Sequence, residues 1–331
     1  MPDVRREKRI TGRRKKCKHA LSLRHDPAGL TRQDLLGFPH MTDWKSITLT
    51  LGHSPDPDDA FMFYAMAAGK IDLRGYRFEH TLQDIQTLNE RASRGELHIT
   101  AVSIHALAHI LDRYAPLPSG ASMGDGYGPM FVTMDRNAGN LPDEEARRDW
   151  LRSRTIAIPG KLTSAYLAAQ LYLGADFRHL VVPFDEIFEA VKTGAVDAGL
   201  IIHEGQLTYA RDGFHLVRDL GAWWKAKTGL PLPLGGNVVR KDIPPDIRSE
   251  LSDILRESIR FGLENRKPAV EHSMAHARGM DVPLADEFIG MYVNDYTLDY
   301  GDKGREAIRR FLGEAAAKGL IPPVGEIEFV E

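Results

Sequence analysis

His203 and Glu204 follow directly after a short apolar segment and are the strongest candidates for chemistry in this sequence. Residues 196–202 read Val-Asp-Ala-Gly-Leu-Ile-Ile, a pattern typical of a buried strand, so the polar pair lies where that strand leaves its sheet. This edge of an open α/β sheet commonly carries the ligand. A neutral imidazole there can accept a proton, as a general base must. The same spacing also fits a purely structural histidine.

A second set of polar side chains lies between a strand predicted at 47–51 and a helix predicted at 60–68. This segment contains Ser54 and Asp58 together with two prolines. Such residues are good helix caps, and capping alone explains them as well as a site does. A loop after the first strand of an α/β sheet also faces the ligand cleft, so both residues stay candidates.

A third loop precedes the helix predicted at 165–173. A glycine turn after the strand predicted at 154–158 leads to Thr163 and Ser164. The start of a helix presents free backbone N–H groups and the positive end of its dipole, which suits a substrate carboxylate. Ordinary capping by Thr163 explains the pattern equally well.

Metal and nucleotide sites are less well supported. His105 and His109 are one helical turn apart and could bind zinc, but the glutamate of an HExxH motif and a third ligand are missing. The glycine-rich segment 119–129 lacks the ending of a phosphate loop and the spacing of a dinucleotide fingerprint. Its glycines are expected to let the backbone pass close to a ligand or bend between domains.

Composition indicates a soluble globular protein with two domains. The chain has 331 residues, of which 43% are hydrophobic and 27% charged. Cys17 is the only cysteine, which excludes an intramolecular disulfide and fits a reducing compartment. No apolar segment approaches the roughly 18 residues that a membrane span needs.

The first 40 residues differ in kind from the rest. They contain eleven Lys or Arg and four Asp or Glu, so we expect a disordered basic tail, or an upstream addition before Met41 from a misassigned start. A secretory signal would need a longer apolar segment, and its absence predicts a cytoplasmic protein. The tail lacks interleaved aromatic residues, so no nucleic-acid partner is expected.

Strands and helices alternate along the chain, which predicts an α/β fold with parallel strand pairs and right-handed crossovers. The polar segment 135–152 is the expected first crossing between two lobes, and the proline-rich segment 229–236 is the expected return. The larger, discontinuous lobe is therefore predicted at 46–150 plus 237–331, and the smaller one at 151–236.

Several ordered motifs resemble those of the futalosine-route enzymes of menaquinone biosynthesis, in particular the cyclic dehypoxanthinyl futalosine lyase (1,4-dihydroxy-6-naphthoate synthase) family. The resemblance covers most of residues 46–300. The matching residues are Ser54-Pro55 with Pro57 and Asp59, Asp84 with Thr87-Leu88-Asn89, Gly124 with Gly126, Gly128 and Pro129, Pro159-Gly160 with Thr163, Gly199 to Glu204, and Asp219-Leu220-Gly221 with Trp223-Trp224 and Thr228 to Gly235.

The resemblance implies a type II periplasmic-binding-protein-like fold, in which two α/β lobes close on a small molecule. It implies cleavage of cyclic dehypoxanthinyl futalosine to 1,4-dihydroxy-6-naphthoate in the cytoplasm, with neither a metal nor an organic cofactor. His203 takes the role of proton acceptor. The implied substrate-binding residues are Ala101, Val102 and Ser103 after the third strand, Thr163, Ser164 and Ala165 at a helix start, and Ser54 and Asn89.

Three departures from the family pattern concern charge. Asp56 and Asp58 replace the usual Cys and Asn, and Ala101 stands where relatives often have a lysine. The two aspartates add negative charge and the missing lysine removes positive charge, so all three departures disfavour an anionic substrate in the cleft. Either the substrate differs, or the charge is balanced by Lys161, Arg91 or another residue.

Two other functions remain open on the sequence alone. A solute-binding protein of a transporter would use the same scaffold without chemistry, because a fold does not decide a function. A chorismate dehydratase of the same pathway would share the scaffold and act on a different small molecule. The sequence leaves the oligomeric state open.

Overall fold

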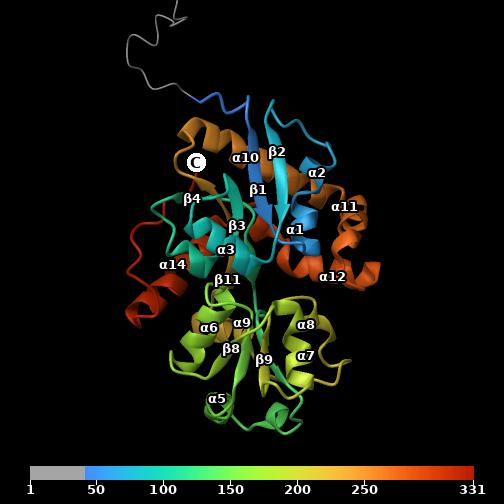
Figure 1. Ribbon diagram of the computed structural model, residues 1–331, viewed down its shortest axis with the longest axis vertical. Helices are drawn as coiled ribbons and strands as arrows, with labels where there is room; N and C mark the ends of the chain where they lie inside the picture. Colours follow the sequence, from blue (N-terminus) through green and yellow to red (C-terminus); the bar gives the residue numbers. More distant parts are fainter. Residues whose placement is uncertain (1–41) are drawn as a thin grey trace, which may run out of the picture. The chain divides into compact units, whose positions relative to one another are not determined.

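Two mixed β-sheets organise residues 42–331, the part of the chain that this computed structural model describes (Figure 1). The tail predicted at 1–40 lies outside these residues. Strands and helices alternate along much of the chain, as predicted.

The first sheet has the strand order β2-β1-β3-β11-β4, with β5 paired to β11. Strand β1 runs parallel to β2 and β3, which confirms the predicted parallel pairing, whereas β11 is antiparallel to β3, β4 and β5. Its strands are β1 (Thr48–His53), β2 (Arg77–Leu82), β3 (Ile99–Ser103), β4 (Tyr114–Pro116), β5 (Ser122–Gly124) and β11 (Leu232–Arg240).

The second sheet has the order β10-β6-β9-β7-β8. Strand β7 is parallel to β8 and β9, and β6 is antiparallel to β9 and β10. Its strands are β6 (Met130–Thr133), β7 (Ile156–Ile158), β8 (His179–Val181), β9 (Ala198–Ile201) and β10 (His215–Asp219).

The strand pairing corrects the predicted crossings. Strand β6 was expected in the larger lobe, but it pairs only with strands of the second sheet. The chain therefore passes between the sheets in the glycine-rich segment before β6, not at 135–152. Here the backbones approach closely, because a Cβ on Gly221 would lie 1.8 Å from the Tyr127 carbonyl oxygen. The return segment, expected as a connector at 229–236, enters the first sheet as β11.

Helices follow the strands and begin at recognisable caps. The side chains of Asp84, Thr163 and Asp219 accept backbone N–H groups at the starts of α3, α6 and α9. None of the helices in residues 42–331 combines the length and the apolar character of a membrane span. The helices are α1 (Pro57–Met62), α2 (Tyr64–Ala67), α3 (Ile85–Ser93), α4 (Ile104–Leu107), α5 (Glu144–Arg152), α6 (Ser164–Leu173), α7 (Ile187–Lys192), α8 (Gly205–Thr208), α9 (Leu220–Thr228), α10 (Pro245–Glu264), α11 (Arg266–Ser273), α12 (Val282–Tyr292), α13 (Asp295–Leu298) and α14 (Gly301–Ala317), with 3-10 turns η2 (Ala138–Asn140), η3 (Phe184–Glu186) and η4 (Met274–His276).

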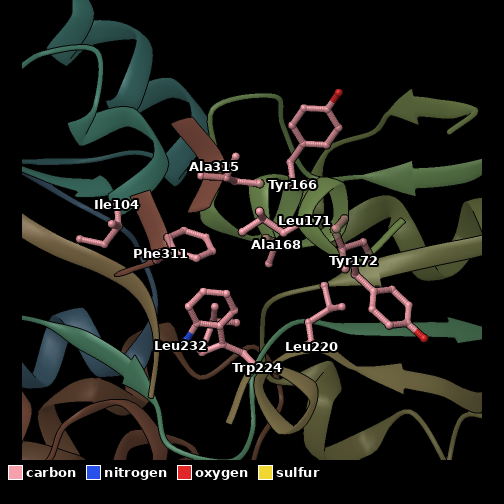
Figure 2. Packing of buried hydrophobic residues seen from close by; sticks show 14 of the residues in the cluster. Ile104, Tyr166, Ala168, Leu171, Tyr172, Leu220, Trp224, Leu232, Phe311 and Ala315 are labelled. Atoms are coloured by element: carbon pink, nitrogen blue, oxygen red, sulfur yellow. The ribbon is translucent and has the colours of Figure 1, made fainter. Parts of the chain in front are cut away.

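One apolar cluster joins the two sheets. Figure 2 shows its centre, where Trp224 of α9 and Phe311 of α14 lie beside residues of α6. The rings of Trp224 and Phe311 meet edge to face with centroids 5.4 Å apart. The same cluster contains Val238 of the first sheet and Leu200 of the second. Both sheets therefore share a continuous core on this side, which fixes the frame around the site.

Candidate functional site

A cavity of about 800 Å³, counting the space at its mouth, lies between the two sheets. Its walls come from the loop after β1, the ends of β3 and β9, the start of α6, and parts of β11 and α12. The lining residues are Ser54, Asp56, Asp58, Asp59, Ile85, Ala101, Val102, Ser103, Gly120, Ser122, Pro129, Thr163, Ser164, Ala165, Ile202, Gln206, Leu234, Gly235, Gly236, Asn237, Phe288 and Tyr292.

The structure brings most of the predicted site residues together around this cavity. Asn89 and His203 are the exceptions, because neither side chain lines it. The predicted residues that do line the cavity are Ser54, Ala101, Val102, Ser103, Thr163, Ser164 and Ala165.

Asn89 lies behind the cavity wall, on the buried face of α3. Its amide Nδ2 donates to Ser103 Oγ (3.0 Å) and to the Leu162 carbonyl (3.2 Å), and its Oδ1 accepts the Ser103 N–H (2.8 Å). The side chain of Asn89 therefore does not line the cavity in this structure, and its contact with a substrate stays a prediction. Asn89 instead fixes Ser103 at the end of β3.

The side-chain hydroxyl groups at the start of α6 have hydrogen-bond partners, and its first backbone N–H groups are available to a ligand. Thr163 Oγ1 accepts the N–H of Tyr166 (3.2 Å), and Ser164 Oγ donates to the Leu234 carbonyl (2.5 Å). Within residues 42–331 the N–H groups of Ser164 and Ala165 have no hydrogen-bond partner. Because both residues line the cavity, this helix start can bind an anion there.

Three aspartates lie at the loop after β1, and burial changes the charge of two of them. Asp59 accepts the Ser54 N–H (2.6 Å), and burial raises the pKa of Asp59 to about 7. Burial, followed by the nearby Asp59 and Asp56 carboxylates, raises the pKa of Asp58 well above its usual value. The shift favours the neutral acid form of Asp58, which can donate a hydrogen bond into the cavity. The charge that it adds to the family pattern is smaller than the sequence suggests.

Arg278 balances the third aspartate, and sequence reasoning missed it. Its Nη2 lies 2.7 Å from Asp56 Oδ1 and its Nη1 lies 3.3 Å from Glu204 Oε2. Arg91, a predicted alternative, pairs with Glu96 at 2.8 Å instead. Arg278 belongs to the turn between η4 and α12, far from both carboxylates in sequence, and no local pattern connects it to them.

His203 lies just beyond Ile202, which lines the cavity at the end of β9. The imidazole is 8% exposed and its centroid is 5.7 Å from those of both Phe184 and Phe188. The N–H of Gly205 donates to Nδ1 (3.0 Å), so the neutral ring carries its proton on Nε2. Within residues 42–331 this buried Nε2 has no partner.

The environment keeps His203 uncharged. Burial lowers the pKa of His203, opposed by the carboxylates of Glu204 and Asp56 and assisted by the cation of Arg278. A neutral imidazole is the form that a general base requires.

The histidine pair considered for zinc has a structural role. His105 Nδ1 lies 3.2 Å from the Thr163 carbonyl oxygen, and the rings of His105 and His109 are 5.6 Å apart. Across the described residues, no three His, Cys, Asp or Glu side chains are grouped so that they could hold a metal ion.

Comparison with solved structures identifies the fold. A crystal structure of a protein from Archaeoglobus fulgidus is similar with a TM-score of 0.77 and 43% identity, covering 83% of this chain and 98% of that one. A Candida albicans protein described as having the generic periplasmic-binding-protein fold matches with a TM-score of 0.63 and 12% identity, covering 86% of this chain and 98% of that one. The predicted periplasmic-binding-protein-like α/β fold is confirmed.

Sequence comparison identifies the family. A family model described as menaquinone biosynthesis matches residues 49–317. The 1,4-dihydroxy-6-naphthoate synthase of Streptomyces coelicolor is 38% identical over 283 residues, covering 84% of this chain and 96% of the relative. The enzyme of the same name from Thermus thermophilus is 38% identical over 275 residues, covering 83% and 96%. The chain belongs to the menaquinone-biosynthesis family, with 1,4-dihydroxy-6-naphthoate synthases among its relatives.

Proposed function

We propose that this protein is a carbon–carbon lyase that converts cyclic dehypoxanthinyl futalosine to 1,4-dihydroxy-6-naphthoate, with His203 as the general base. Membership of the menaquinone-biosynthesis family supports an enzyme of that pathway, and the name of its relatives supports the product. The observation that carries the proposal is the position of a neutral imidazole, whose Nε2 has no partner within residues 42–331, beside a cavity lined by seven of the predicted binding residues.

The cavity offers a complement to a substrate with one carboxylate and several hydroxyl groups. We place the carboxylate at the free N–H groups of Ser164 and Ala165, at the positive end of α6. Ser103, held by Asn89, and the protonated Asp58 supply neutral donors for the remaining polar groups. This arrangement needs no lysine at position 101, because the helix start supplies the positive potential.

His203 would take a proton from the substrate as the carbon–carbon bond breaks. The neutral ring carries its proton on Nε2 in this structure, so base action at Nε2 requires a proton on Nδ1 instead. Glu204 Oε2, at 3.7 Å, is the carboxylate nearest to accept that Nδ1–H. The proposal also requires the mouth of the cavity to rearrange, because the imidazole does not line it here.

The test is turnover by purified protein, measured as formation of the naphthoate product. We expect His203→Gln to lower kcat by about 10² to 10⁴, the usual loss for a general base. His179→Gln is the matched control, because His179 lies in β8 of the same sheet and does not line the cavity; it should keep the wild-type rate.

Three outcomes would contradict the proposal. Equal turnover by wild type and His203→Gln would remove His203 from the mechanism. Turnover of chorismate by the wild-type protein, with no product from cyclic dehypoxanthinyl futalosine, would assign the cavity to a different substrate. Tight binding of the futalosine derivative without any conversion would indicate a ligand carrier.

A further inference from the structure

An ion bridge joins the two sheets at the edge of the cavity, where Asp56 lines it and the partly exposed Arg278 and Glu204 lie outside its lining; we call this edge the mouth. Asp56 lies in the loop after β1 of the first sheet, and Glu204 follows β9 of the second. Arg278 contacts both carboxylates, at 2.7 Å and 3.3 Å, and its guanidinium lies over the ring of Phe184, 4.7 Å from the centroid. One side chain therefore joins the two sides of the mouth beside His203.

The backbone at Arg278 has an unusual conformation, which sets the direction of its side chain. Its φ is 42°, in the left-handed region that L residues rarely adopt, and Gly279 follows with a φ of 84°. Among residues 42–331 only Arg74 shares a positive φ without being glycine (52°). Arg74 also forms ion pairs, with Asp253 at 3.2 Å, but it does not line the cavity.

The bridge shares one carboxylate with the imidazole. Glu204 Oε2 lies 3.3 Å from Arg278 Nη1 and 3.7 Å from His203 Nδ1. In this structure His203 Nδ1 accepts the backbone N–H of Gly205 at 3.0 Å. Arg278 and His203 therefore share this carboxylate, and the guanidinium offsets part of its negative charge at the ring.

We propose that Arg278 is a positioning residue for the reaction, which holds Asp56 and Glu204 at the mouth of the cavity and thereby keeps His203 uncharged and able to accept a proton. The inference rests on the proposed role of His203 as the base. Without the guanidinium, two carboxylates would face the imidazole, and the charged form of the ring would be favoured. Asp56, Glu204 and Arg278 are the charged groups that act on this ring.

The test is the titration of His203 followed by NMR on the full chain, without substrate. We expect Arg278→Gln to shift the titration to higher pH, because it removes a cation, and Glu204→Gln to shift it to lower pH, because it removes an anion. Arg278→Lys keeps the cation and should stay closer to wild type. Arg74→Gln removes the comparable remote arginine and should leave the titration unchanged.

Turnover gives the second readout. The acid limb of the kcat/KM profile should move to higher pH in Arg278→Gln, and below the new pKa the neutral fraction falls about tenfold for each pH unit. The loss should therefore be larger at low pH than at high pH, whereas a merely structural defect lowers the whole profile evenly. Arg74→Gln should match wild type throughout.

Titration of His203 at the same pH in wild type and Arg278→Gln would overturn the inference. So would shifts of the same sign in Arg278→Gln and Glu204→Gln. If Arg278→Gln does not fold, Arg278→Met is measured in its place, because it also removes the cation but keeps an apolar side chain beside Phe184, and the same shift to higher pH is expected. Absence of lyase turnover with the expected opposite shifts would defeat the proposed function but leave the role of Arg278 at this histidine intact.

Discussion

Asp58 is the residue whose expected charge differs most between the sequence and the structure. In the sequence it is an extra negative charge beside a cleft for an anion, but burial and two neighbouring carboxylates raise its pKa well above the usual value. The neutral acid has nearly the shape of an asparagine side chain. A carboxyl group that stays protonated can therefore replace an amide in a binding site.

Asp58→Asn should stabilise the protein in a pH-dependent way. In the unfolded chain Asp58 ionises near pH 4, whereas the folded state holds the proton to higher pH. Ionisation thus favours the unfolded wild type increasingly as pH rises above about 4, until the folded group also ionises. The difference in Tm between Asp58→Asn and wild type, measured by thermal denaturation, should grow as pH rises above about 4 and level off where the folded group ionises.

The exposed Asp176 supplies the control for that experiment. Asp176→Asn should change Tm by an amount that is constant across the same pH range, because an exposed carboxyl group meets no burial penalty. A flat difference for Asp58→Asn would show that Asp58 is ionised in the folded protein. The cavity would then carry more negative charge than we infer.

At the scale of elements, close backbone packing limits which residues can occupy the segments where the chain passes between the sheets. Gly221, at the start of α9, lies against the carbonyl of Tyr127, and a Cβ there would come within 1.8 Å of that oxygen. We expect Gly221→Ala to lower the free energy of unfolding by about 1–3 kcal/mol, the usual cost of overpacking. Chemical denaturation measures this change.

Gly313 in the middle of α14 is the matched control, because a Cβ there would meet nothing within 4 Å. Gly313→Ala should raise the free energy of unfolding by about 0.5–1 kcal/mol through helix propensity alone. If Gly221→Ala proves as stable as wild type, the close approach does not constrain the crossing.

The elements also show what the sequence could predict. Alternation and caps located most of them, and β2 has the predicted bounds of 77–82. Pairing partners were harder, because β6 has the same apolar pattern in either sheet and its neighbours β9 and β10 come much later in the chain. The sequence did not predict the short strands β4 and β5, because three residues are too few to show a periodic pattern.

The candidate site likewise contains residues that the sequence could predict and residues that only the folded chain brings together. Ser164 was predictable because it opens a helix, and such places face the cleft in this kind of fold, whereas Ser103 was expected only from the family resemblance. Arg278 was not, because its partners Asp56 and Glu204 come from other segments and only the folded chain brings them together.

In the whole molecule, two kinds of contact hold the sheets around the cavity. The apolar cluster around Trp224 and Phe311 joins them through a packed core. At the mouth, Arg278 and a hydrogen bond from Tyr292 Oη to Gln206 Oε1 (2.5 Å) join them through polar groups. The Arg278 ion pairs join partly exposed groups and are therefore weaker than a packed apolar core, whereas Tyr292 and Gln206 are buried. We therefore expect ligand entry to open the mouth and leave the apolar side in place.

A crystal structure of His203→Gln with cyclic dehypoxanthinyl futalosine would test this account most directly. We predict that the substrate lies in the cavity between the sheets, with its carboxylate at the N–H groups of Ser164 and Ala165. Residue 203 should then reach the substrate through a rearranged mouth. A substrate bound outside the cavity, or bound inside it with residue 203 still shielded from it, would contradict the account.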